Sequence, residues 1–124
     1  MITGIHHVSM KCTAEEYPRV HAFYTELLGL CAEHEWTGGV MYRCGNCLIE
    51  IFNDQPGIRE KGAVRHFAFC CDTVDETVKK LEEAGYECFV APKEIILDSK
   101  PEVRARIAFV KGPVGEEIEL FDEH

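Results

Sequence analysis

The sequence predicts an α+β fold: two tandem βαβββ units that form a curved mixed sheet with helices on its outer face. Three observations support this prediction. The chain repeats itself, each half carries one amphipathic helix that ends at a glycine, and each half closes with a nearly identical strand, IEIF at 49–52 and IELF at 118–121. Repetition at a period of several tens of residues is typical of a duplicated structural unit.

The repeat also includes the first strand of each half. The segment HHVSMKC aligns with RHFAFCC, so that His7 falls on His66, and the closing strands align Glu50 with Glu119. A polar segment rich in turn-forming residues, NDQPGIREKG, separates the two copies. We therefore expect one domain, residues 1–124, with a first unit at about 1–53, a linker at 54–62 and a second unit at about 63–124.

Apolar residues recur at helical spacing once in each half. They are Val20, Phe23, Tyr24, Leu27 and Leu28 in the first half, and Val74, Val78, Leu81 and Ala84 in the second. A Thr-x-x-Glu pair, which can form a capping box, precedes each stripe, and a glycine, which can end a helix in the left-handed conformation, follows it. These boundary residues are Thr13, Glu16 and Gly29 for the first helix, and Thr73, Glu76 and Gly85 for the second.

Strand parity indicates which faces of the sheet are buried. Gly45-Asn46 predicts a two-residue hairpin turn between the strands VMYRC and CLIEIF, and the later strands of the second half are YECFV, VRARIAFV and EEIELF. Successive side chains of a strand point to opposite faces, and we expect the helices to cover the apolar face of the first and last strands. Four polar residues then project from the helix-free side: His7, Glu50, His66 and Glu119.

The composition excludes several classes of function. Of the 124 residues, 46% are apolar and 28% are charged, as in ordinary globular proteins. The formal net charge of −9 repels nucleic acids and anionic lipids, and no apolar run approaches the ~20 residues of a membrane span. We expect no nucleic acid or membrane partner. Because the N-terminus lacks export-signal features and the seven cysteines are an odd number, we expect reduced thiols and a cytoplasmic location.

Two imidazoles and two carboxylates on one face are a suitable ligand set for a divalent metal ion. Imidazole nitrogen suits nickel, zinc, cobalt or iron, and carboxylate oxygens neutralise the charge of the ion. Each residue alone has a simpler explanation, as a hydrogen-bonded histidine or a solvent-facing glutamate, but the matched pattern in both halves favours a metal. We therefore predict the ligands His7, Glu50, His66 and Glu119. His6 is the alternative to His7, and both the repeat register and the strand parity favour His7.

The motifs HHVSMKC, FYTELLGL, CLIEIF, RHFAFCC and IAFVKGPVGEEIELF together resemble the vicinal oxygen chelate superfamily, most closely its glyoxalase I-like (lactoylglutathione lyase-like) members. The resemblance covers nearly the whole chain. It implies the glyoxalase/bleomycin resistance/dioxygenase fold and a nickel, cobalt or zinc ion at the four predicted ligands. It also implies a homodimer, whose metal site lies within one chain or is shared across the interface.

The resemblance further implies a reaction. A glyoxalase-like lyase/isomerase converts the hemithioacetal of a 2-oxoaldehyde and a thiol, such as glutathione or another low-molecular-weight thiol, into a 2-hydroxyacyl thioester through a metal-stabilised enediolate. Glu119 would transfer the proton, with Glu50 as its counterpart in the other half. Lys11 would bind the carboxylate of the thiol. Arg104 and Arg106 could face the same cavity and bind a carboxylate, or could instead lie on an exposed strand edge.

Other interpretations stay open. An acyl-CoA epimerase uses a similar metal set, whereas a non-catalytic antibiotic-binding protein of the bleomycin-resistance type generally lacks it. An extradiol dioxygenase would use only two histidines and one carboxylate. Asn53 or Asp54 stands where glyoxalases tend to carry an amide that holds glutathione, and an aspartate there would repel a carboxylate. The Cys44-Gly45-Asn46-Cys47 segment is a lone CxxC, which a hairpin turn explains.

Overall fold

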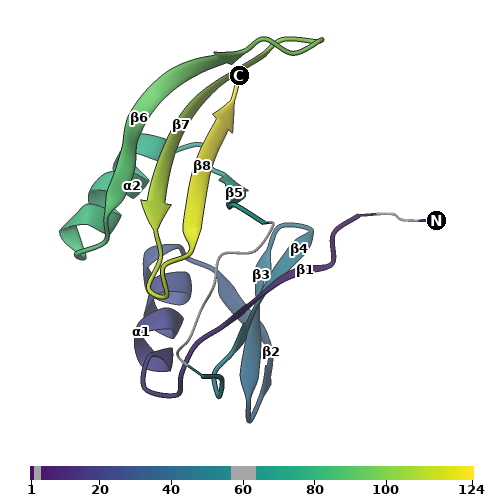
Figure 1. Cartoon of the computed structure of the whole chain (residues 1–124), viewed down its shortest axis with the longest axis vertical. Helices are drawn as coiled ribbons and strands as arrows, with labels where there is room; N and C mark the ends of the chain where they lie inside the picture. The colour runs from purple at the N-terminus through teal and green to yellow at the C-terminus, as the bar shows by residue number, and fades with distance from the viewer. Residues whose placement is uncertain (2–3, 57–63) are drawn as a thin grey trace. The chain divides into compact units, whose positions relative to one another are not determined.

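The computed structural model describes residues 1, 4–56 and 64–124. These residues belong to two compact units, Met1–Glu60 and Lys61–His124. Each unit consists of one strand, one helical segment and three further strands (Figure 1). Most of the predicted linker at 54–62 lies outside the described residues.

The first unit contains a four-stranded mixed sheet. Its elements are β1 (His7–Lys11), α1 (Tyr17–Ala22), η1 (Phe23–Leu27), β2 (Cys31–Trp36), β3 (Gly39–Cys44) and β4 (Cys47–Phe52). The strand order is β1-β4-β3-β2. The edge strand β1 is parallel to β4, and the other neighbouring strands are antiparallel.

The second unit repeats this topology. Its elements are β5 (Phe67–Cys70), α2 (Val74–Glu83), β6 (Cys88–Leu97), β7 (Val103–Lys111) and β8 (Glu117–Glu123). The strand order is β5-β8-β7-β6, with β5 parallel to β8 and the other pairs antiparallel. The predicted α+β fold of two tandem βαβββ units is confirmed.

The first helical segment begins as the sequence predicts but continues differently. The backbone N–H of Thr13 donates to Glu16 Oε1 at 2.9 Å, and that of Glu16 donates to Thr13 Oγ1 at 3.1 Å. This reciprocal capping box precedes α1, and Gly29 adopts a left-handed φ of 75° after the segment. The later part, η1, is a π-helix rather than the expected α-helix. The Thr25 hydroxyl donates to the carbonyl of His21 at 2.7 Å and so competes for a backbone acceptor.

The second helix has the predicted boundaries but lacks the predicted cap. Thr73 is its N-cap residue, and Gly85 follows its end with a φ of 92°. The predicted capping box with Glu76 is wrong, because the helix has no side-chain hydrogen bond at its N-cap. The Thr73 hydroxyl instead lies 3.1 Å from the hydroxyl of Thr77.

Each unit has its own apolar core between its helix and its sheet. In the first unit, Tyr24 stacks on Tyr42 with ring centroids 5.6 Å apart, and His21 Nδ1 lies 2.8 Å from the Tyr42 hydroxyl. Burial raises the pKa of Tyr42, so this phenol stays neutral in its core position. In the second unit, the fully or nearly fully buried residues of helix and sheet are Val74, Val78, Leu81, Ala105, Ile107, Ala108, Val110, Ile118 and Leu120.

An ion-pair network joins α2 to the sheet of the second unit. Arg106 of β7 donates through Nη2 to Asp75 Oδ1 at 2.7 Å and through Nε to the other carboxylate oxygen. Arg106 Nη1 also lies 3.6 Å from Glu94 of β6. This bidentate contact lowers the pKa of Asp75 below its ordinary value.

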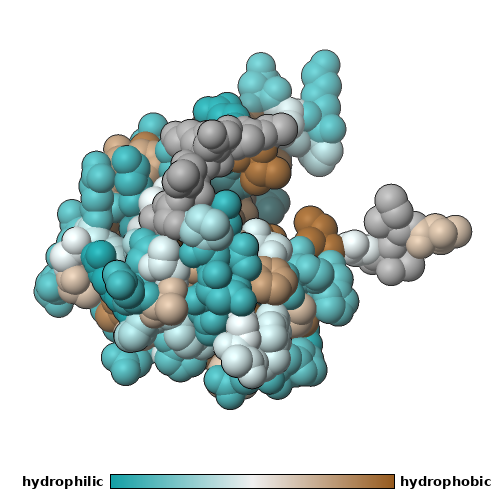
Figure 2. Space-filling model, turned by 60° about the horizontal axis from the view of Figure 1, so that its bottom comes forward, coloured by the Kyte–Doolittle hydropathy of each residue, from teal (hydrophilic) through white to brown (hydrophobic). Residues whose placement is uncertain are grey.

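Polar residues dominate much of the molecular surface. Hydrophilic side chains prevail on the face drawn in Figure 2, and hydrophobic ones occur there in small groups. Among the residues that the structure describes, no helix is long and apolar enough to cross a lipid bilayer.

Replacement of Leu81 by alanine tests the core of the second unit. Leu81 is 0% exposed, so the Leu81→Ala substitution removes buried methyl groups and leaves a cavity. We expect the free energy of unfolding to fall by about 2–5 kcal/mol, measured by urea denaturation. Glu82→Ala, at an exposed position of the same helix, should change it by less than about 0.5 kcal/mol. Equal effects of the two substitutions would contradict the described packing.

The Arg106–Asp75 contact predicts a pH dependence of stability. The lowered pKa of Asp75 means that its stabilising contribution is complete above the ordinary aspartate pKa of about 3.9 and is lost as the pH falls through the lowered folded-state pKa. Asp75→Asn should therefore lower the melting temperature near neutral pH and make its fall in acid shallower than in the wild type. Asp98→Asn, at an exposed residue between β6 and β7, is the matched control. Identical acid profiles of the wild type and Asp75→Asn would refute this role.

Candidate functional site

The first unit brings one predicted imidazole to one predicted carboxylate. Ser9 of β1 is the register partner of Glu50 of β4, so His7, two residues earlier on the same face, reaches Glu50 diagonally. His7 Nε2 lies 3.6 Å from Glu50 Oε1. The His7 side chain is 37% exposed, whereas that of Glu50 is only 9% exposed. A buried carboxylate thus meets a ring that is open to solvent.

The second unit repeats this arrangement at the equivalent positions. Ala68 of β5 is the register partner of Glu119 of β8, and His66 precedes Ala68 by two residues. His66 Nε2 lies 3.2 Å from Glu119 Oε2, and the two side chains are 33% and 12% exposed. The His66 ring also packs edge-on against Phe109 of β7, with centroids 5.0 Å apart. The duplication therefore preserves the relation between the two side chains as well as the strand order.

The donor atoms of each pair fit a shared divalent ion. Two ligand atoms about 2.1 Å from one ion, at about 90–110° to each other, lie about 3.0–3.5 Å apart. The observed separations of 3.6 Å and 3.2 Å are close to this range. As far as the structure describes them, neither unit gathers three His, Cys, Asp or Glu side chains around one point. Each unit by itself supplies two of the four predicted ligands. That all four bind one ion stays a prediction.

The adjacent histidines at the start of β1, His6 just before the strand and His7 its first residue, differ in their contacts. Among the described residues, His7 and not His6 lies within ion-pair distance of Glu50. His6 Nδ1 lies 2.9 Å from His7 Nδ1, on the side of the ring opposite to the nitrogen that faces Glu50. This geometry favours His7 over His6 as the partner of the carboxylate.

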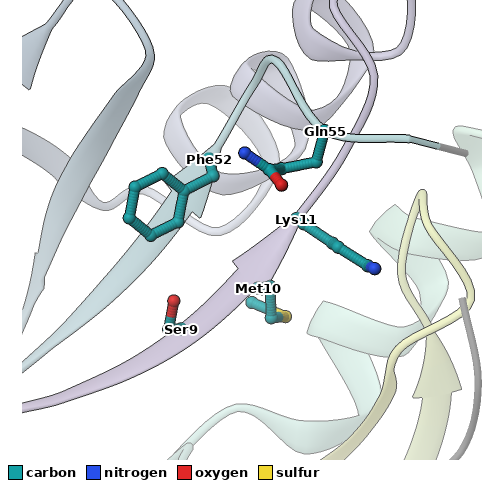
Figure 3. Close-up of a pocket in the computed structure, with 5 residues that line it drawn as sticks. All are labelled: Ser9, Met10, Lys11, Phe52 and Gln55. Atoms are coloured by element: carbon teal, nitrogen blue, oxygen red, sulfur yellow. The ribbon is translucent and has the colours of Figure 1, made fainter.

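Lys11 lines a hollow at the end of β1. The hollow is an open space of about 470 Å³ lined by Ser9, Met10, Lys11, Phe52 and Gln55 (Figure 3). Gln55 was not identified from the sequence, which pointed to Asn53 or Asp54 as the amide-bearing position. Its Nε2 donates to Asp54 Oδ1 at 2.7 Å. The side-chain amide that lines the hollow is therefore that of Gln55, one or two positions after the expected Asn53 or Asp54.

Arg104 and Arg106 lie on the other face of their sheet. Phe109 is the register partner of Glu119 and shares its face, so the alternate residues of β7, among them Arg104 and Arg106, project to the opposite face. The contact of Arg106 with Asp75 of α2 confirms that this is the helix-bearing face. Arg104 Nε lies 3.1 Å from Glu102. This placement differs from the expectation that both arginines face the same cavity as the glutamates.

The CxxC segment forms the expected hairpin. Cys44 and Cys47 are register partners at the ends of β3 and β4, and Gly45 in the turn has a left-handed φ of 57°. Neither cysteine forms a disulfide bond. The turn accounts for the spacing of this pair of cysteines.

Comparison with known proteins agrees with these features. Residues 4–120 match the model of the Glyoxalase/Bleomycin resistance protein/Dioxygenase superfamily. No curated protein gives a match.

Several solved structures share the fold. A glyoxalase family protein from Enterococcus faecalis is 25% identical, with 96% of this chain and 97% of that chain covered and a TM-score of 0.70. The trypanothione-dependent glyoxalase I of Leishmania major is 20% identical, with coverage of 98% and 87% and a TM-score of 0.76. The fosfomycin resistance protein FosX of Listeria monocytogenes is 16% identical, with coverage of 98% and 94% and a TM-score of 0.73.

The family model spans nearly the whole chain, and the duplicated strand order and the paired His and Glu side chains recur in both halves. The chain belongs to the glyoxalase/bleomycin resistance protein/dioxygenase superfamily, also called the vicinal oxygen chelate superfamily.

Proposed function

We propose that this protein is a metal-dependent, glyoxalase-like lyase/isomerase. It converts the hemithioacetal of a 2-oxoaldehyde and a low-molecular-weight thiol, such as glutathione, into a 2-hydroxyacyl thioester. One observation carries the proposal: each unit presents a nearly buried carboxylate beside a partly exposed imidazole, at equivalent positions of the same topology. Membership of a superfamily that includes glyoxalases supports it.

The four ligands of the proposed metal are His7, Glu50, His66 and Glu119. Nickel, cobalt or zinc suits this mixture of imidazole nitrogen and carboxylate oxygen. The two pairs belong to one chain or, in a homodimer, to two chains. When bound, such an ion acts as a Lewis acid that stabilises the negative charge on the two adjacent oxygens of an enediolate.

Glu119 is the proposed general base and acid. Its carboxylate takes the proton from the carbon that bears the thiol sulfur and returns it to the neighbouring carbon. Its register partners on the same face, Ala68 and Phe109, have no hydrogen-bonding side-chain groups. The carboxylate oxygens of Glu119 are therefore available for contact with His66 and with the substrate. Glu50 is the equivalent carboxylate of the first unit, and Ser9 and Met41 lie beside it.

Lys11 is the proposed binding residue for the carboxylate of the thiol. By strand parity it lies on the same face of β1 as His7, and it is one of the residues that line the hollow. Arg104 and Arg106 have no role in the proposed site, because they lie on the helix-bearing face.

Metal titration tests the ligand set. We expect the chain to bind nickel, cobalt or zinc tightly in isothermal titration calorimetry. His7→Ala and Glu119→Gln should each weaken binding by at least about 10-fold, because each removes a ligand. His124→Ala is the matched control: His124 Nε2 lies 2.9 Å from Glu94, but both side chains are more than half exposed. Full metal affinity in both ligand variants would refute the site. A metal-free yet ligand-binding protein would favour a sequestering function.

Turnover of a panel of hemithioacetals tests the reaction. The metal-loaded chain should produce thioester, followed by its absorbance, and Glu119→Gln should lower kcat by about 10²–10⁴-fold because the proton-transfer group is lost. Metal content is measured in the same samples to separate loss of the base from loss of the ion. A Glu119→Gln variant that retains both metal and full turnover would show that Glu119 is not the base.

A further inference from the structure

Two cysteines face each other at the turn between β3 and β4. Cys44 ends β3, Cys47 begins β4, and the two are register partners across the hairpin that joins these strands (Figure 1). The φ of Gly45 is 57°, whereas that of Asn46 is not positive. This is the pattern of a type II′ turn, whose twist matches that of the flanking strands. The turn therefore holds the two cysteines opposite each other.

The register brings the two backbones within reach of a disulfide bond. Opposite residues of an antiparallel pair have Cα atoms about 4.5–5.5 Å apart, and disulfide-bonded cysteines have Cα atoms about 4.4–6.8 Å apart. Their Cβ atoms, about 4.5–5.5 Å apart in such a pair, need to approach by at most about 1 Å to reach disulfide geometry. Cys47 Sγ donates to the carbonyl oxygen of Leu48 at 3.5 Å, a weak contact that rotation of the side chain releases.

Both side chains lie on the helix-bearing face of the sheet. Cys47 precedes Glu50 by three residues, so the two side chains project to opposite faces. Tyr42, which stacks on Tyr24 of η1, precedes Cys44 by two residues and marks the same face. Both cysteines are partly exposed, so an oxidant can approach them from solvent. The pair is thus separated by the sheet from the proposed metal ligands.

No other two cysteines among the described residues are register partners. Cys31 of β2 pairs with Arg43, which adjoins Cys44 and projects to the opposite face. The strand cysteines of the second unit, Cys70 and Cys88, pair with apolar residues. The opposed arrangement of two thiols is therefore specific to the hairpin of the first unit within the described part of the chain.

We propose that Cys44 and Cys47 form a redox-active dithiol, which the disulfide of a low-molecular-weight thiol converts into an intramolecular disulfide. The thiolate of one cysteine attacks a sulfur of the oxidant, whose S–S bond breaks and releases one thiol. The thiolate of the other cysteine attacks the protein sulfur of this mixed disulfide and displaces the second thiol. The pair loses two protons and two electrons, which reduce the oxidant to two thiol molecules.

The short loop indicates a reversible bond rather than a structural cross-link. The disulfide closes a loop of only four residues, 44–47. Because the entropy that a cross-link removes from the unfolded chain falls with loop length, this bond adds little to stability. The proposal is independent of the proposed function, since the thiols and the proposed metal ligands lie on opposite faces of the sheet.

Tryptic mapping of the full-length protein tests the pair directly. Trypsin cleaves after Arg43 and Arg59, so both cysteines lie in the peptide 44–59, which contains no other cysteine. The reduced protein is incubated with oxidised glutathione and EDTA, and its remaining thiols are then alkylated in denaturant. We expect the peptide to lose two hydrogen atoms and to carry neither glutathione nor an alkyl group. Two alkylated thiols, or glutathione retained on either cysteine, would overturn the proposal.

The same oxidation in urea tests whether the fold brings the thiols together. The ratio of intramolecular disulfide to glutathione adduct measures the effective concentration of one thiol at the other. We expect this ratio to be at least about 10-fold higher in the folded chain than in the denatured chain, because the hairpin holds the thiols opposite each other. Equal ratios would show that the fold makes no contribution and would refute the proposal.

Two serine variants assign the thiols. Cys44→Ser should leave a stable glutathione adduct on Cys47, because no partner thiol can displace the glutathione. Cys31→Ser, at an exposed cysteine of the neighbouring strand, is the matched control and should form the disulfide to the same extent as the wild type. Loss of the disulfide in Cys31→Ser would contradict the pairing of Cys44 with Cys47.

Discussion

The burial of a carboxylate within an otherwise apolar strand is the constraint on which the site depends. Glu50 is 7% exposed and has buried isoleucines on both sides in sequence. An ionised group in such a position is costly unless an opposite charge or hydrogen bonds compensate it. The His7 ring, 3.6 Å away, is the partner that the fold supplies within the first unit. His66 lies in the equivalent position, 3.2 Å from Glu119, in the second unit.

This arrangement follows from a parallel edge strand beside the closing strand of each unit. In the parallel pairs β1–β4 and β5–β8, a residue two positions before the register partner of the glutamate lies diagonally next to it. An antiparallel hairpin at this place would reverse the direction of the first strand. The helix between the two strands covers the opposite face, so the apolar side chains of the same strands are buried under it. One topology therefore supplies both a core and a polar face, and the duplication supplies each of them twice.

The two polar faces are not identical. In the first unit, the Trp36 and Phe52 rings contact each other, whereas in the second a phenylalanine packs on the histidine of the pair. Arg106, which resembles a substrate-binding residue in sequence, instead ties α2 to β7 and β6.

The sequence by itself determined the duplicated topology, the two left-handed glycines that end the helices, and the shared sheet face of His7 with Glu50 and of His66 with Glu119. These features depend on local patterns: strand parity, helical spacing, turn residues and the alignment of one half with the other. The helical spacing did not predict the π-helical part of the first helix, in which the Thr25 hydroxyl donates to the His21 carbonyl. Only the tertiary structure decided which face of β7 carries Arg104 and Arg106, and which residues line the hollow with Lys11. Both depend on strand register, which pairs residues far apart in the chain and leaves no local trace in the sequence.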